Sequence, residues 1–158
     1  MIDVMSYVPP EVVDVLRRRF PERSGEEIDA QLGECLKFLY VVSAEEATFL
    51  PLTREVDETW HELILQTAFY QKLCAALPGG RFLHHHPAPL GKYADQLGRR
   101  ESVRRLLQWI PWYVAYFGGF SEETARYWVI VDLLRTRLGM SLEEINELGR
   151  RELRSRAA

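Results

Sequence analysis

The sequence has little cysteine, little histidine and no long apolar run, and each shortage narrows the class of protein. Its 158 residues include two cysteines, Cys35 and Cys74, too few for a disulfide-stabilised secreted domain. The longest uncharged run, residues 106–121, contains Pro111 and Gly118-Gly119 and is shorter than the roughly 20 residues of a membrane-spanning helix. We therefore expect a soluble, cytoplasmic protein with reduced thiols and no membrane partner.

The net charge is also small: 20 Lys and Arg residues nearly balance 23 Asp and Glu residues and leave a net charge of −3. Such a balance favours neither a polyanionic partner nor an acidic tail. The N-terminus carries Asp3 and no basic segment, which argues against a signal peptide. The length and a hydrophobic content of 47% predict one domain over residues 1–158.

Helical periodicity is the strongest pattern that the sequence does contain, and no segment alternates as a strand would. Ser24 with Glu27, and Ser141 with Glu144, have the spacing of capping boxes that begin helices. We expect an all-α, single-domain bundle of about six helices, the fourth kinked or broken at Pro111. The expected helices cover residues 10–20, 25–42, 56–77, 96–117, 122–138 and 141–156.

The third expected helix has the clearest apolar stripe and is followed by a histidine-rich loop over residues 81–92. Spacings of four and three place seven residues on one helix face. These are Val56, Trp60, Leu63, Thr67, Tyr70, Cys74 and Leu77. We expect this stripe to be core, with Trp60, Tyr70 and Cys74 beneath the loop as pocket or supporting residues.

All the histidines lie on this helix and its loop, and Asp57 precedes the first of them by one helical turn. Asp57 and His61, four residues apart, project side by side at the border of the stripe. In an extended loop His84 and His86 face away from His85, so at most two of the three can join the helical pair. Imidazoles and a carboxylate suit zinc or non-haem iron.

The same residues permit a second interpretation. An Asp–His pair at this spacing is often only a side-chain hydrogen bond that fixes a loop, and the spacing is less specific than HExxH. The protein would then be a non-catalytic module that binds a protein or RNA. Its contact surface would be the aromatic segment or the basic C-terminal helix with Arg150, Arg151, Arg154 and Arg156.

The helix and loop resemble those of the glycine-rich-domain-containing-protein-like family, a group of helical domains. The resemblance covers about residues 25–128 and is carried by three short motifs. They are Val56, Asp57, Trp60, His61, Thr67, Tyr70 and Cys74; Phe82, His84, His85 and Pro87; and Tyr113, Phe117 and Gly118. The chain differs in having Leu63 where a second helical histidine is common, and in lacking the glycine-rich tail.

The resemblance implies that the paired histidines are His84 and His85, with His86 at a variable position. The resulting hypothesis is a site of Asp57, His61, His84 and His85 that binds a divalent metal, zinc or iron, and a small molecule. No residue identifies a catalytic group, a substrate or a reaction.

Aromatic residues are concentrated in residues 109–120, which include Trp109, Trp112 and Tyr113. Rings at helical spacing are typical of the core of a small helical protein. The alternative is a ligand pocket or a surface that stacks bases, with Arg99, Arg100, Arg104 and Arg105 nearby.

Overall fold

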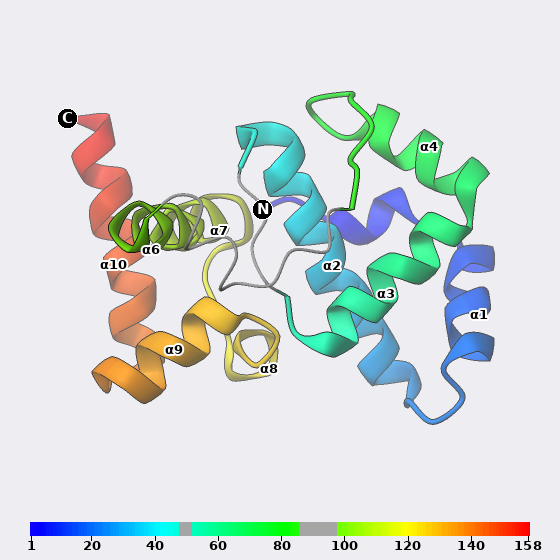
Figure 1. Ribbon diagram of the computed structural model, residues 1–158, viewed down its shortest axis with the longest axis horizontal. Coiled ribbons are helices and arrows are strands. Elements are labelled where there is room, and N and C mark those ends of the chain that lie inside the picture. The colour runs from blue at the N-terminus through cyan, green and yellow to red at the C-terminus, as the bar shows by residue number, and fades with distance from the viewer. Residues whose placement is uncertain (48–51, 86–97) are drawn as a thin grey trace. The chain divides into compact units, whose positions relative to one another are not determined.

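The computed structural model describes residues 1–47, 52–85 and 98–158, and all regular elements in these residues are helices (Figure 1). The all-α prediction is therefore confirmed. The number of helices is higher than the six expected, since three of the expected helices are each broken in two within the described residues. None of the described helices is long and apolar enough to cross a bilayer.

Residue contacts divide the chain into two units. The N-terminal unit comprises Asp3–Ala47 and Leu52–His84, and the C-terminal unit comprises Met1–Ile2 and the described residues of His85–Ala158. The division falls at the peptide bond between His84 and His85. Folding of residues 1–158 as one domain, expected from the length, stays a prediction.

The N-terminal unit is built around one long buried helix. Its elements are the 3-10 helix η1 (Val4–Tyr7) and helices α1 (Pro10–Arg19), α2 (Gly25–Glu45), α3 (Arg54–Leu65) and α4 (Thr67–Ala76). The expected capping box begins α2, because Ser24 Oγ accepts from Glu27 N and Glu27 returns a bond to Ser24 N. Helices α1 and α3 pack against α2, and the Phe38 ring of α2 contacts Trp60 edge-on at 5.3 Å.

The third expected helix is broken at Gln66, which corrects the prediction of one helix over residues 56–77. Gln66 leaves the helical region with φ −82° and ψ 66° and ends α3, while α4 begins at Thr67. Thr67 is exposed, so it does not belong to the apolar stripe. The other six stripe residues are buried, because the break turns α4 so that Tyr70 and Cys74 face the interior.

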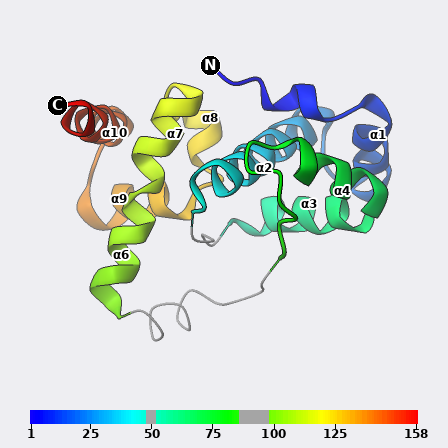
Figure 2. The ribbon, with the colours of Figure 1, turned by 90° about the horizontal axis from the view of Figure 1, so that it is seen from above.

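The C-terminal unit contains five helices among its described residues: α6 (Arg99–Leu107), α7 (Trp109–Phe117), α8 (Glu122–Ala125), α9 (Val129–Leu138) and α10 (Leu142–Ala157). Helices α6 and α7 follow nearly one line (Figure 2). Pro111 is the third residue of α7, and its ring prevents the carbonyl of Leu107 from accepting a helical bond. The predicted interruption at this proline is thus confirmed, with the break at Gln108.

The expected helix over residues 122–138 is also broken, at Arg126–Trp128, between α8 and α9. Trp128 is extended and fully buried, with its ring 5.6 Å from that of Trp109 and 5.2 Å from that of Tyr113. We attribute the break between α8 and α9 to the burial of this large ring in the aromatic core. No glycine or proline in the sequence predicts a break at this point.

Helix α10 packs closely on α7, and Gly149 makes this approach possible. A Cβ atom at Gly149 would lie 2.7 Å from Val114 Cγ2 and 3.2 Å from the carbonyl oxygen of Ile110. The second capping box, of Ser141 and Glu144, begins this helix as predicted. Asn146 holds the loop between α7 and α8, because its side-chain amide accepts a hydrogen bond from Phe120 N and donates one to Phe120 O.

Trp60 gives a direct test of which helix faces form the core. It is 4% exposed, whereas Leu65 on the same helix is 67% exposed. We expect Trp60→Ala to lower the free energy of unfolding by about 3–5 kcal/mol, through the lost apolar contacts and the cavity left behind. Leu65→Ala, as the control, should change it by less than about 0.5 kcal/mol. Urea unfolding measures both, and equal midpoints for the two variants would show that the core face is wrongly assigned.

Candidate metal centre

Asp57 and His61 form the helical half of the candidate site. Both project from α3, one turn apart, with His61 Nε2 3.8 Å from Asp57 Oδ2. The side chains are 39% and 51% exposed respectively, although the neighbouring Val56 and Trp60 are buried. The pair therefore lies at the edge of the core, as the periodicity predicted, and is open to a ligand from solvent.

The segment after α4 is tied to the interior by one buried hydroxyl. Tyr70 Oη donates a hydrogen bond of 2.5 Å to the carbonyl oxygen of Leu83 and accepts one of 3.1 Å from Trp60 Nε1. The side chains of all three residues are buried. A buried carbonyl group needs such a hydrogen-bond partner. The bond therefore holds the segment at Leu83 against helices α3 and α4.

Side chains alternate along this segment. Leu83 is buried and His85 is half-buried, whereas Phe82 and His84 are exposed. The His84 ring lies against Phe82, with the ring centres 4.8 Å apart, and Phe82 contacts Tyr70 edge-on at 5.4 Å. The side chains of His84 and His85 thus lie on opposite sides of the backbone.

Within the described residues, one candidate group of metal ligands results: Asp57, His61 and His85. Each offers one ligand atom, and these atoms all lie within 4.8 Å of one another. His85 follows His84 directly, so the peptide bond to the anchored segment Arg81–His84 places it beside α3. Two imidazoles and a carboxylate in this arrangement match the donors of zinc and non-haem iron sites.

The other two histidines have different outcomes. His84 is outside this group, with its ring beside Phe82, so its role as a ligand stays an expectation from the sequence that this group does not include. His86 lies outside the described residues. Alternation alone allowed either side of the loop to face the helix; in the structure Leu83 is buried and His85 belongs to the ligand group.

A buried polar cluster lies beneath the pair. Burial raises the pKa of the Tyr70 hydroxyl well above its usual value, and the adjacent Cys74 thiol raises it further. Burial also raises the pKa of the Cys35 thiol on α2, with a smaller contribution from the charge of Asp57. Trp60, Tyr70 and Cys74 are all buried, and their role as supporting residues of the site stays a prediction. Cys35 and the Leu83 carbonyl were missed, because no pattern in the sequence links them to Asp57 or Tyr70.

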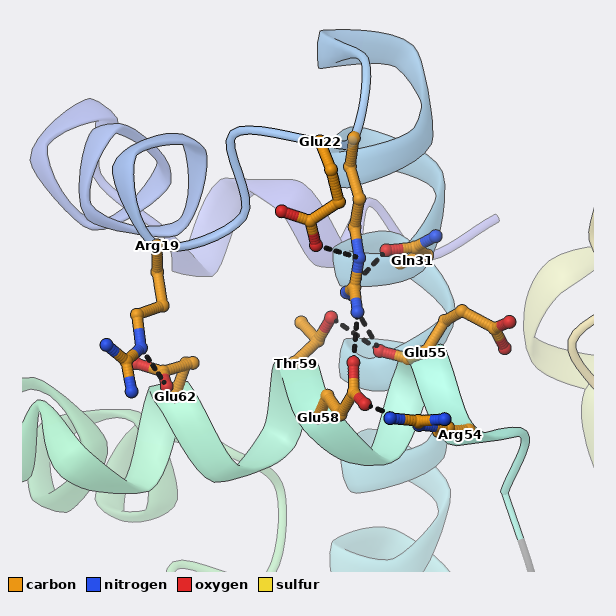
Figure 3. A network of polar contacts seen from close by, with 9 residues as sticks. Arg19, Glu22, Gln31, Arg54, Glu55, Glu58, Thr59 and Glu62 are labelled. Atoms are coloured by element: carbon orange, nitrogen blue, oxygen red, sulfur yellow. Dashed lines mark hydrogen bonds and ion pairs between the residues drawn. The ribbon is translucent and has the colours of Figure 1, made fainter.

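His61 also borders an open cleft of about 630 Å³. The lining residues come from α3 and from the end of α1 with its following loop: Arg19, Phe20, Glu22, Arg23, Arg54, Glu55, Glu58, His61 and Glu62. Figure 3 shows a polar network along this cleft that includes Gln31, Glu55 and Glu58. Arg23 donates to Gln31, to Glu58 and to the carbonyl oxygen of Glu55. The network ties the loop before α2 to α3.

The aromatic candidates belong to the core of the C-terminal unit. Trp109 and Tyr113 are fully buried and Trp112 is half-buried, with Tyr113 stacked on Phe120 at 3.9 Å. Many of the arginines considered for RNA binding are paired with acids. Arg104 and Arg105 contact Glu101, while Arg150, Arg154 and Arg156 of α10 contact Glu143, Glu147 or Glu152. Such pairing weakens the attraction for a polyanion.

The fold and the ligand group define an all-helical protein with a candidate metal centre. The chain matches the UCP032817-like family over residues 1–113 and belongs to that family. The match includes the whole of α1–α4 and all three residues of the group. No curated protein and no solved structure matches the chain.

Glu58 gives the cleft a testable pH dependence. Hydrogen bonds from Arg54 and then from Arg23 lower the pKa of Glu58 below its ordinary 4.5. A carboxyl group whose pKa is lower in the folded state stabilises the fold above its unfolded pKa, and this contribution is lost as the pH falls through the folded value. We therefore expect Glu58→Gln to destabilise the protein at neutral pH, by an amount that shrinks below about pH 4. Urea unfolding of both proteins across this range measures the difference, and a difference independent of pH would contradict the assignment.

Proposed function

We propose that this protein binds one divalent metal ion, zinc or iron, through Asp57, His61 and His85. The observation that carries the proposal is the convergence of three ligand atoms from α3 and from the anchored segment after α4. Helical spacing alone accounts for the Asp57–His61 pair, but not for the arrival of a third ligand on the same side.

The separations are compatible with one ion after a small adjustment. Metal–ligand bonds of about 2.0–2.2 Å place two ligands of a tetrahedral ion about 3.4 Å apart. His61 Nε2 and Asp57 Oδ2 are 3.8 Å apart, and the largest separation in the group is below 4.8 Å. Rotation of exposed side chains closes a gap of this size, because neither His61 nor Asp57 is packed tightly.

Three protein ligands leave at least one position for a small molecule. A structural zinc ion in proteins has four protein ligands, whereas catalytic zinc and non-haem iron keep open positions. With His61 half exposed and beside the cleft, a water molecule or small ligand has access to that position. Bound metal there would lower the pKa of the water or orient an oxygen ligand.

Two further proposals accompany the site. The resemblance to the glycine-rich-domain-containing-protein-like family rests on the same helix and loop, and it would extend the proposed site to those relatives. A cytoplasmic location agrees with two buried cysteines that form no disulfide.

Metal content of the native protein tests the proposal. Protein purified without a histidine tag or chelating resin should contain about one equivalent of zinc or iron by elemental analysis. His61→Ala and His85→Ala should lose it, because two ligands hold an ion poorly. His84→Ala is the matched control, and both it and His86→Ala should retain the metal.

Two results would count against this function. Metal-free wild-type protein that folds normally and binds neither zinc nor ferrous iron would favour the structural alternative, in which the cluster only holds the loop. Metal loss in His84→Ala, with His85→Ala unaffected, would show that the opposite side of the loop faces α3.

A further inference from the structure

We propose that Tyr70 is a positioning residue of this metal site, and that its hydroxyl sets the metal affinity by holding the Leu83 carbonyl. This inference rests on the proposed function. Tyr70 need not touch the ion for this role, because it acts through the backbone that carries His85.

The hydroxyl connects to the backbone beside two of the ligands. Leu83, which accepts its 2.5 Å hydrogen bond, lies two residues before His85. Trp60, which donates to it at 3.1 Å, lies directly before His61 on α3. A single oxygen atom therefore fixes the distance between the helix of His61 and the segment of His85.

Among the described residues, Leu83 takes part in one hydrogen bond, the bond from Tyr70 to its carbonyl oxygen. Arg81 anchors the start of the segment, donating to the Val42 and Ser43 carbonyls at the end of α2. Between Arg81 and His85 no helix or strand holds the backbone, so rotations there would move His85 unless Leu83 is held. The Tyr70 bond supplies that restraint.

The restraint is protected from water and from pH. Tyr70 is 1% exposed, so solvent does not compete for the Leu83 carbonyl. Burial raises the pKa of the hydroxyl, which therefore remains protonated and able to donate through the neutral range. Support of this kind, from groups behind the ligands, typically changes metal affinity by about 10–100-fold when it is removed.

Tyr70→Phe is the direct test, because it removes the hydroxyl and keeps the ring. Trp60→Phe is the matched control, since it removes the other hydrogen bond of the same hydroxyl and leaves the bond to Leu83. We expect the zinc affinity, measured by competition with a chromophoric chelator, to fall about tenfold or more in Tyr70→Phe. In Trp60→Phe it should stay within about threefold of wild type.

A purely structural role for Tyr70 gives a different pattern. Tyr70→Phe loses both hydrogen bonds of the hydroxyl, and Trp60→Phe loses one of them together with buried ring volume, so a purely structural role would lower the zinc affinity of both variants along with their urea midpoints. Affinity loss confined to Tyr70→Phe supports positioning, whereas equal affinity in Tyr70→Phe and wild type overturns it. If wild type binds zinc and His61→Ala does not, then equal affinity of Tyr70→Phe and wild type rejects the positioning role of Tyr70 but leaves the metal site intact. Wild-type protein that binds no metal rejects both.

A second variant keeps the inference testable if Tyr70→Phe fails to fold. One glycine inserted between Leu83 and His84 retains the anchor and makes His84 the second residue after Leu83. Alternation then directs His84 to α3 and turns His85 away. We expect zinc binding of this insertion variant to be lost in His84→Ala and kept in His85→Ala. An unchanged dependence on His85 would overturn the proposal.

Discussion

The hydroxyl of Tyr70 joins three separate stretches of chain at one buried point. It links α4, which carries it, to Trp60 on α3 and to the backbone at Leu83. Without this bond the Leu83 carbonyl would be buried and unsatisfied, which proteins rarely tolerate. Asp57 and His61 lie on α3, which the bond from Trp60 joins to this point, and His85 lies two residues after the anchored Leu83.

The polar contacts of Arg23 are a second constraint on the position of α3. The Arg23 guanidinium lies over the Phe20 ring at 3.8 Å and reaches Gln31 on α2 as well as Glu55 and Glu58 on α3. Its side chain is 11% exposed, so its charge is largely removed from water and depends on these partners. Arg23 therefore fixes α3 relative to α2 beside the cleft, while Tyr70 fixes α3 relative to the histidine segment.

Local signals were reliable wherever a short motif satisfies its own backbone groups. The capping boxes at Ser24 and Ser141 begin helices as expected, and α7 and α9 end before Gly118 and Gly139, at the expected bounds. Periodicity alone was less reliable. The stripe from Val56 to Leu77 continues through Gln66 without a break in spacing, yet the helix ends there, and the exposed Thr67 shows that the pattern held only on either side.

The sequence by itself determined the helical class, the core face of α3 and the pairing of Asp57 with His61, because each depends on residues within a turn or two. Only the tertiary structure brings a ligand atom of His85, rather than one of His84, within 4.8 Å of the ligand atoms of that pair. Both histidines fit the same motif, and an extended segment presents either side equally well. We infer that the choice comes from the buried bond between Tyr70 and Leu83, a contact across 13 residues that has no periodic signature.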